Sequence, residues 1–239
     1  IDYPYSDARN TLGQMWVSSD AVQYVLDQPM VREPGEAWAY NSGTSILLGG
    51  ILEQATGQDV LAFAREYLFE PLGIQDVEWH KAPGNHYHTD GGLYLKPRDM
   101  ARLGYLMLHG GTWDGREIVS PEWVARSTEA RYQTDVGKGY GYQWWMLDGG
   151  IYAAHGHYEQ LIYVVPEADM IVVFAGQIPD DVIAPTDGLL YRYILAACTD
   201  LQAGTSHTGS TWIGFGATPA SEGRPGRGWS GAHLLVESR

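Results

Sequence analysis

The sequence holds a single cysteine, Cys198, among its 239 residues. One cysteine excludes an internal disulfide framework and any zinc site built from several thiolates. Basic residues are also scarce, because 15 Lys and Arg stand against 29 Asp and Glu and leave a net charge of −14. Binding to nucleic acid needs a basic surface that displaces counterions, so this balance argues against a nucleic-acid partner.

Long hydrophobic runs are missing as well. No apolar stretch approaches the roughly 20 residues that a membrane-spanning helix needs. The chain begins with Ile1, and no charged segment followed by an apolar one opens it, so no signal peptide is visible. A removed leader or a truncated start would give the same observation, so the sequence does not assign a compartment. It does not assign an oligomeric state either.

Three motifs of well-known enzyme classes do not occur. Without a Gly-x-Ser-x-Gly turn, the α/β-hydrolase interpretation lacks its nucleophile. Without a Walker loop or a His-Glu-x-x-His pair, phosphoryl transfer on a P-loop and zincin-type proteolysis have no basis.

Apolar residues recur at helical spacing through most of the first 130 residues and again near residue 190. Ser19 is expected to cap the first helix, and Gly57 to end the second. The predicted helices cover 20–28, 45–56, 60–70, 97–109, 122–130 and 187–198. The segment 74–92 is rich in His, Pro, Gly and Asn, and we expect a long loop there.

From Tyr140 the pattern changes to that of strands. Strands are predicted over 140–146, 151–155, 160–165 and 170–175. A hairpin turn is expected at Asp148-Gly149-Gly150, and a β-turn over 166–169. Helices, then an antiparallel meander, then a closing helix make an α+β fold.

The end of the chain differs in composition. From Leu201 to Arg239 there is no Asp, Lys or Tyr, and Gly, Ser, Thr, Ala, Arg and Pro dominate. Such a composition predicts little packed structure. We therefore expect one domain over 1–198 and a tail of low order over 199–239.

A histidine-rich segment suggests a metal site. His86-Tyr87-His88-Thr89-Asp90 has the His-x-His-x-Asp spacing of the di-zinc hydrolases of the metallo-β-lactamase type. Alternate residues of an extended segment share a face, so two imidazoles could bind one metal ion. However, Gly91 stands where those enzymes carry a further histidine, and no predicted strand precedes the segment. The other interpretation is a polar surface loop.

Tyr40-Asn41-Ser42 stands directly before the predicted helix that begins at Ser45. One interpretation is structural, with Tyr40 packed beside Trp38 and the two polar residues capping the helix. The other is catalytic, with Tyr40 as a proton acceptor. A phenol has a pKa near 10, so it needs neighbouring cations to act as a base.

Several stretches together resemble one family. They are, in order, PGEAWAYNSG, SILLGGILEQATG, LFEPLGI, GGLYLKPRDMARLGYLMLHGG, TWDGREIVSPEWV, YGYQWW and IYVVPEADMIVVF. Their order and spacing resemble the C-terminal two thirds of the serine β-lactamase-like hydrolases, which include class C β-lactamases, penicillin-binding carboxypeptidases, esterases and the 6-aminohexanoate-dimer hydrolase. The resemblance covers about residues 1–198. It implies an antiparallel sheet flanked by helices, a helical subdomain, and acyl-enzyme chemistry without a cofactor.

The family uses three motifs, and the first is absent. No serine of this sequence has a lysine three positions later, so the Ser-x-x-Lys motif with its nucleophile is missing. In the family this motif lies upstream of the matched region, and we expect the chain to begin after it. The second motif, Tyr-x-Asn or Tyr-x-Ser, falls on Tyr40 and Ser42.

The third motif, Lys-Thr-Gly, falls on Ala154-His155-Gly156 when Gly156 is matched to its glycine. In relatives that also lack the lysine, the residue after the glycine donates its backbone N–H to the oxyanion, which here is His157. The imidazoles of His155 and His157 either add positive charge near the substrate or lie in solvent at the edge of the sheet.

The resemblance therefore implies a serine hydrolase of small esters or amides. Because Ala154 replaces the lysine that helps to hold a substrate carboxylate, uncharged substrates are favoured over β-lactams. We expect no turnover from this chain alone, since the nucleophile is absent. A non-catalytic domain that binds peptides or cell-wall fragments and the zinc hydrolase are the alternatives.

Overall fold

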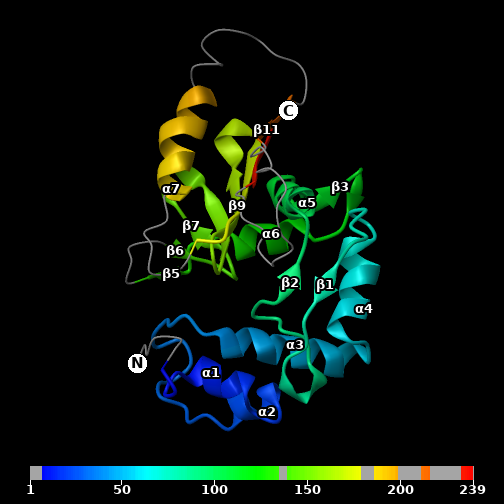
Figure 1. Cartoon of the computed structure of the whole chain (residues 1–239), viewed down its shortest axis with the longest axis vertical. Coiled ribbons are helices and arrows are strands. Elements are labelled where there is room, and N and C mark those ends of the chain that lie inside the picture. The colour runs from blue at the N-terminus through cyan, green and yellow to red at the C-terminus, as the bar shows by residue number, and fades with distance from the viewer. Residues whose placement is uncertain (1–6, 135–138, 179–185, 199–210, 216–232, 239) are drawn as a thin grey trace, which may run out of the picture. The chain divides into compact units, whose positions relative to one another are not determined.

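The computed structural model describes residues 7–134, 139–178, 186–198, 211–215 and 233–238 (Figure 1). The chain forms two compact units, Ile1–Leu95 and Lys96–Arg239, and each has its own hydrophobic core. Among the described residues, no helix has both the length and the apolar character needed to cross a membrane.

The first unit is mainly helical. Its elements are α1 (Thr11–Trp16), α2 (Ala21–Leu26), α3 (Ser42–Thr56), α4 (Val60–Ala64), the π-helical turn η1 (Arg65–Phe69), β1 (Glu78–Trp79), the 3-10 turn η2 (Pro83–Asn85) and β2 (Leu93–Tyr94). Met15, Ala21, Ile46 and Ala82 form its buried cluster, so α1, α2 and α3 pack together. As predicted, α3 ends at Gly57, whose φ of 70° is the left-handed conformation that favours glycine.

The cap of α2 differs from the prediction by one residue. Asp20, not Ser19, is the N-cap, because its backbone is extended and its carboxylate accepts a hydrogen bond from the Gln23 amide. Either side chain can cap a helix, so composition alone does not choose between neighbours.

The expected long loop over 74–92 is also partly wrong. Glu78 and Trp79 of β1 pair with Tyr94 and Leu93 of β2 in an antiparallel ladder. Two-residue strands carry too little alternation to be recognised in a sequence.

The second unit combines a sheet with helices. Its elements are α5 (Pro97–Leu108), β3 (Thr112–Trp113), β4 (Arg116–Glu117), α6 (Pro121–Ser127), β5 (Tyr132–Gln133), β6 (Gly139–Tyr140), β7 (Trp145–Met146), the 3-10 turn η3 (Asp148–Gly150), β8 (Tyr152–Gly156), β9 (Gln160–Val165), the 3-10 turn η4 (Pro166–Ala168), β10 (Met170–Ala175), α7 (Thr186–Leu189), the π-helical turn η5 (Leu190–Leu195), β11 (Thr211–Phe215) and β12 (His233–Ser238). The start of α5 at Pro97 and the bounds of β9 and β10 agree with the predictions, and α6 begins one residue before its predicted start at 122.

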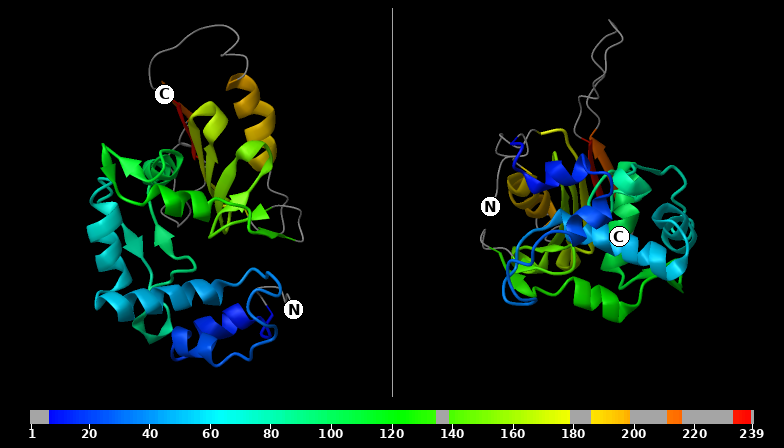
Figure 2. Two further views of the ribbon diagram at one scale, coloured as in Figure 1. Left: turned by 180° about the vertical axis from the view of Figure 1, so that it is seen from behind. Right: turned by 90° about the horizontal axis from the view of Figure 1, so that it is seen from below.

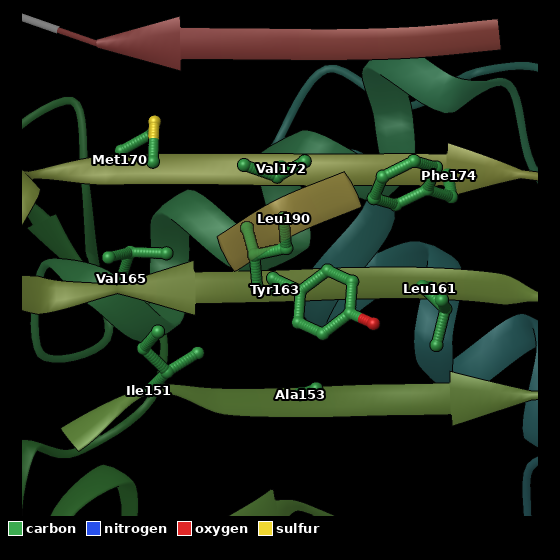
Figure 3. Packing of buried hydrophobic residues seen from close by; sticks show 9 residues of the cluster. All are labelled: Ile151, Ala153, Leu161, Tyr163, Val165, Met170, Val172, Phe174 and Leu190. Carbon is green, nitrogen blue, oxygen red and sulfur yellow. The ribbon is translucent and has the colours of Figure 1, made fainter. Parts of the chain in front are cut away.

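The large sheet has the order β11-β12-β10-β9-β8-β7-β6-β5, and every pair is antiparallel. Successive side chains of its central strands point to opposite sides of the sheet. The side chains on both sides are buried. One face, which includes Tyr163 and Val172, packs with Leu190 of η5 (Figure 3). The other, with Ile162 and Ile171, packs on α5, so helices lie on both sides of the sheet (Figures 1 and 2).

The predicted strand over 140–146 is divided into β6 and β7. Gln143 has a φ of 70°, which turns the backbone between them. Gly141 lies against the backbone of α6, where a Cβ atom would stand 2.1 Å from the carbonyl oxygen of Ser127. The aromatic run is therefore a hairpin, and its turn depends on a left-handed residue that the apolar pattern does not reveal.

After residue 198, where we expect little packed structure, the structure describes two strands. β12 pairs with β10 over six residues, from Met170↔Ser238 to Ala175↔His233, and β11 pairs with β12. The open edge of β10 offers unpaired backbone groups, and the run Leu234-Leu235-Val236 has the β propensity to pair with it. The remaining residues of this part of the chain lie outside the described residues, and the boundary at 198 stays a prediction.

Candidate functional site

Tyr40 lies immediately before α3 in the first unit, and 58% of its surface is exposed. Its neighbour Trp38 is partly buried. The Tyr40 side chain is therefore largely exposed to solvent. An accessible phenol is a condition for proton transfer to or from a substrate.

Asn41 and Ser42 do not cap α3 with their side chains. Asn41 is the N-cap residue by its backbone conformation, yet no side-chain cap hydrogen bond is formed, and Ser42 is the first helical residue. Instead, the hydroxyl of Thr44 donates to the carbonyl oxygen of Asn41 at 2.7 Å. The capping interpretation, in which these two side chains serve the helix end, is thus not supported by the hydrogen bonds.

The histidine-rich segment holds the helices of this unit together. Nδ1 of His86 lies 2.8 Å from Oε2 of Glu53 on α3, and its Nε2 lies 3.7 Å from Oδ1 of Asp20. The hydroxyl of Thr89 donates to the carbonyl oxygen of Ser45 on α3 at 2.6 Å. This segment therefore packs on the helix that follows Tyr40.

The two imidazoles of the proposed metal motif have different partners. His88 contacts the carboxylate of Asp90 at 3.2 Å and the ring of Trp16 edge-on, whereas His86 contacts Glu53 and Asp20. In the described part of the chain, no group of three or more His, Cys, Asp and Glu side chains is arranged to hold a metal ion. The contacts thus favour the structural interpretation of His86-Tyr87-His88-Thr89-Asp90.

The third-motif residues lie in one hairpin of the second unit. His155 and Gly156 end β8, and His157 opens the three-residue turn to Gln160 of β9. A Cβ atom at Gly156 would stand 3.2 Å from the backbone oxygen and from Cβ of Gln160, so the two strands approach closely there. His157 is thus the first residue of the turn, and its role as an oxyanion donor stays a prediction.

The turn is attached to the rest of the unit through residues that the sequence analysis missed. Oε1 of Glu159 lies 3.1 Å from Nε2 of His155, and its other oxygen accepts a hydrogen bond from the hydroxyl of Thr186. Twenty-seven residues separate Glu159 from Thr186, and neither belongs to a motif. Only the fold brings them together, so no sequence signal was available.

The phenol of Tyr163 extends this polar network into the core. Tyr163 is buried in β9, and its hydroxyl donates to Oδ1 of Asp187 at 2.6 Å. Burial, together with the neighbouring carboxylate of Asp187, raises the pKa of Tyr163 above its ordinary value. The phenol therefore stays protonated and serves as a fixed donor.

The predicted site residues thus fall into two groups. Tyr40 and Ser42 lie at the start of α3 in the first unit, and His155, Gly156 and His157 share the β8–β9 hairpin of the second. The hairpin brings the last three together, while Tyr40 and Ser42 are sequence neighbours. Ala154, at the position of the motif lysine, packs against the core cluster of the α5 face.

Comparisons with known proteins identify the family of the chain. A family model described as Beta-lactamase matches residues 2–196. The chain is 29% identical over 156 residues to the 6-aminohexanoate-dimer hydrolase of Paenarthrobacter ureafaciens, which covers 59% of this chain and 39% of that protein. It is 30% identical over 91 residues to the lovastatin esterase of Penicillium rubens, covering 38% of this chain and 22% of that protein.

Among solved structures, a proposed 6-aminohexanoate-dimer hydrolase from Bacillus anthracis superposes with a TM-score of 0.70 at 19% identity, over 85% of this chain and 57% of that one. This likeness shows the shared fold and confirms the predicted α+β, β-lactamase/transpeptidase-like class. The chain spans less than two thirds of the length of each of these relatives. Because the family model matches most of its length, the chain belongs to the beta-lactamase family.

Proposed function

We propose that the protein containing this sequence is a serine hydrolase that cleaves small esters or amides through an acyl-enzyme. Tyr40 is the general base or proton shuttle, assisted by Ser42, and the backbone N–H of His157 stabilises the oxyanion. The observation that carries this proposal is the exposed phenol of Tyr40 before a helix that Asn41 and Ser42 do not cap with their side chains. An exposed side chain can be reached by a substrate, as proton transfer requires.

Two further observations support the reaction class. The relatives include a 6-aminohexanoate-dimer hydrolase and a lovastatin esterase. The β8–β9 hairpin places His157 directly after a glycine that tolerates little extra volume. A backbone N–H in such a position is worth a few kcal/mol of transition-state stabilisation in acyl transfer.

The nucleophile is the part that this sequence does not supply. None of its serines belongs to a Ser-x-x-Lys motif, so turnover is proposed for a protein that carries that motif together with these residues. The 239-residue chain alone is expected to be inactive. Incubation of this chain with a fluorophosphonate probe tests this point. We expect no stoichiometric labelling, and labelling of any serine would overturn the expectation.

The experiment on function uses the complete gene product that contains this sequence. It is incubated with p-nitrophenyl butyrate, and kcat/KM is measured for the wild type and for Tyr40→Phe. We expect a loss of about 100-fold or more, since a general base contributes about 10²–10⁴. Tyr67→Phe is the matched control, because Tyr67 is another exposed tyrosine of the same unit.

The same experiment separates the alternatives. A gene product without a Ser-x-x-Lys motif and without hydrolysis, but with measurable binding of a peptide or cell-wall fragment, would favour the non-catalytic domain. Hydrolysis that is unaffected by Tyr40→Phe but lost on treatment with a chelator would favour the zinc hydrolase.

A further inference from the structure

The turn that carries His157 has a strained backbone. Tyr158 and Glu159 have φ values of 59° and 65°, and neither is a glycine. The left-handed conformation is unfavourable for residues with a Cβ atom and persists only where the surroundings fix it. Residues with such backbone strain cluster at functional sites. The contacts that hold this turn are therefore the ones that fix the backbone around His157.

Backbone contacts from the segment after β10 form one clamp. The amide of Gly176 donates to the carbonyl oxygen of Glu159 at 3.1 Å, and the amide of Ile178 donates to that of Tyr158 at 3.4 Å. A Cβ atom at Gly176 would stand 2.9 Å from the Tyr158 carbonyl oxygen, so the segment lies closely against the turn.

The Glu159 side chain forms a second clamp. One carboxylate oxygen accepts from the hydroxyl of Thr186 at the start of α7, and the other contacts His155 on β8. The Glu159 side chain is largely buried, and Thr186 is buried too. Next to Thr186, Asp187 accepts from the buried phenol of Tyr163, which fixes the start of α7 to the centre of the sheet.

We propose that Glu159 is a positioning residue, which fixes the strained 157–159 turn to α7 and thereby sets the position of the His157 backbone N–H. Its link to catalysis rests on the proposed function. A carboxylate serves this purpose well, since it accepts from two donors on different elements and its hydrogen bonds are strong. Glu159 itself contacts no reacting atom; it acts through the backbone of the turn.

The kinetic test uses the complete gene product with p-nitrophenyl butyrate. Glu159→Ala and Thr186→Val should each lower kcat about tenfold or more with little change in KM, because a donor misplaced by about 1 Å loses transition-state stabilisation. Thr186→Ser keeps the hydroxyl that Thr186→Val removes, and this variant should have the kcat of the wild type. Glu129→Ala removes an exposed carboxylate that pairs with Arg131 at 3.0 Å, and it should leave kcat unchanged.

Thermal melting of each variant separates positioning from stability. If Glu159→Ala lowers Tm but leaves kcat within twofold of the wild type, the positioning role is overturned. The same conclusion follows if Thr186→Ser fails to restore kcat in a protein that melts like the wild type.

A second readout does not need activity. In the 239-residue chain, hydrogen exchange of the amides over 155–161 should become faster in Glu159→Ala and stay unchanged in Glu129→Ala. An unchanged rate in both would overturn the proposal. If the wild-type gene product hydrolyses nothing, the proposed function fails, and this exchange result alone decides whether Glu159 fixes the turn.

Discussion

Nδ1 of His86 lies 2.8 Å from Oε2 of Glu53, which joins the histidine-rich segment to the last turn of α3. Both side chains are mostly buried, so the contact is shielded from solvent. It gives a structural reason for a histidine that the sequence spacing had associated with a metal. Its loss should therefore affect stability.

We expect His86→Ala to lower the free energy of unfolding of the chain by about 1.5–3 kcal/mol, the range for a hydrogen bond to a charged group. His80→Ala is the control, since the His80–Glu78 pair is largely exposed and such pairs are worth less than about 1 kcal/mol. Urea denaturation measures both. Equal effects of the two variants, or stoichiometric zinc in protein purified without chelators, would contradict the structural role.

Gly104 allows α5 to approach the sheet. A Cβ atom there would stand 2.8 Å from Cγ2 of both Ile162 and Ile171, so Gly104→Ala overpacks the core and should cost about 1–3 kcal/mol of unfolding free energy. Gly188→Ala on α7 meets nothing within 4 Å and should instead stabilise by about 0.5–1 kcal/mol. Thermal melts of both variants test the opposite signs, and a stabilising Gly104→Ala would refute the close approach.

The sheet centre was predictable and the edges were not. The bounds of β9 and β10 agree with the prediction because both faces of these strands are apolar, and Pro166 to Asp169 form a clear turn. In contrast, β12 follows a Gly- and Ser-rich segment, and it is a strand through its pairing with β10 and β11. Strand pairing with a distant segment is a property of the fold, which local composition does not contain.

The candidate site divides in the same way. Short continuous motifs of the sequence predicted Tyr40, Ser42 and the hairpin residues 155–157 as site residues. Glu159 and Thr186 did not, since their contact joins a turn to a helix 27 residues later. The left-handed backbone of Tyr158 and Glu159 was equally hidden, because neither is a glycine or an asparagine.

Stability should fall at alkaline pH because two tyrosines are buried. Burial raises the pKa of Tyr152 to about 12 and also raises that of Tyr163. In the unfolded chain both ionise near pH 10, so the unfolded state binds fewer protons above that pH. The stabilising contribution is thus complete below about pH 10 and is lost as the pH rises towards the folded-state values.

Urea midpoints between pH 8 and 11 measure this loss, and Tyr152→Phe and Tyr163→Phe should each reduce it. Tyr163→Phe should also lower stability at pH 8, because it leaves Asp187 without the phenol that donates to it at 2.6 Å. Tyr152→Phe separates burial from that hydrogen bond, since burial alone raises the pKa of Tyr152. An alkaline slope that neither variant changes would contradict the assignment.

Substrate charge provides the last prediction. We propose that Ala154 takes the position of the lysine of the Lys-Thr-Gly motif, and Ala154 packs with the core cluster of the α5 face. In the complete gene product, p-nitrophenyl butyrate should therefore be hydrolysed with a higher kcat/KM than mono-p-nitrophenyl glutarate, which adds a terminal carboxylate. The net charge of −14 acts in the same direction by repelling the anion.

Salt separates these two contributions. Raising the ionic strength from about 0.01 to 1 M shortens the Debye length from about 30 to 3 Å, so long-range repulsion is screened while a missing local cation is not replaced. A preference for the neutral ester that persists at high salt points to the absence of the lysine at position 154. A preference that disappears points to net charge alone. Faster cleavage of the anionic ester at both salt concentrations would instead require a cation elsewhere in the site, with His155 and His157 as the nearest candidates in sequence.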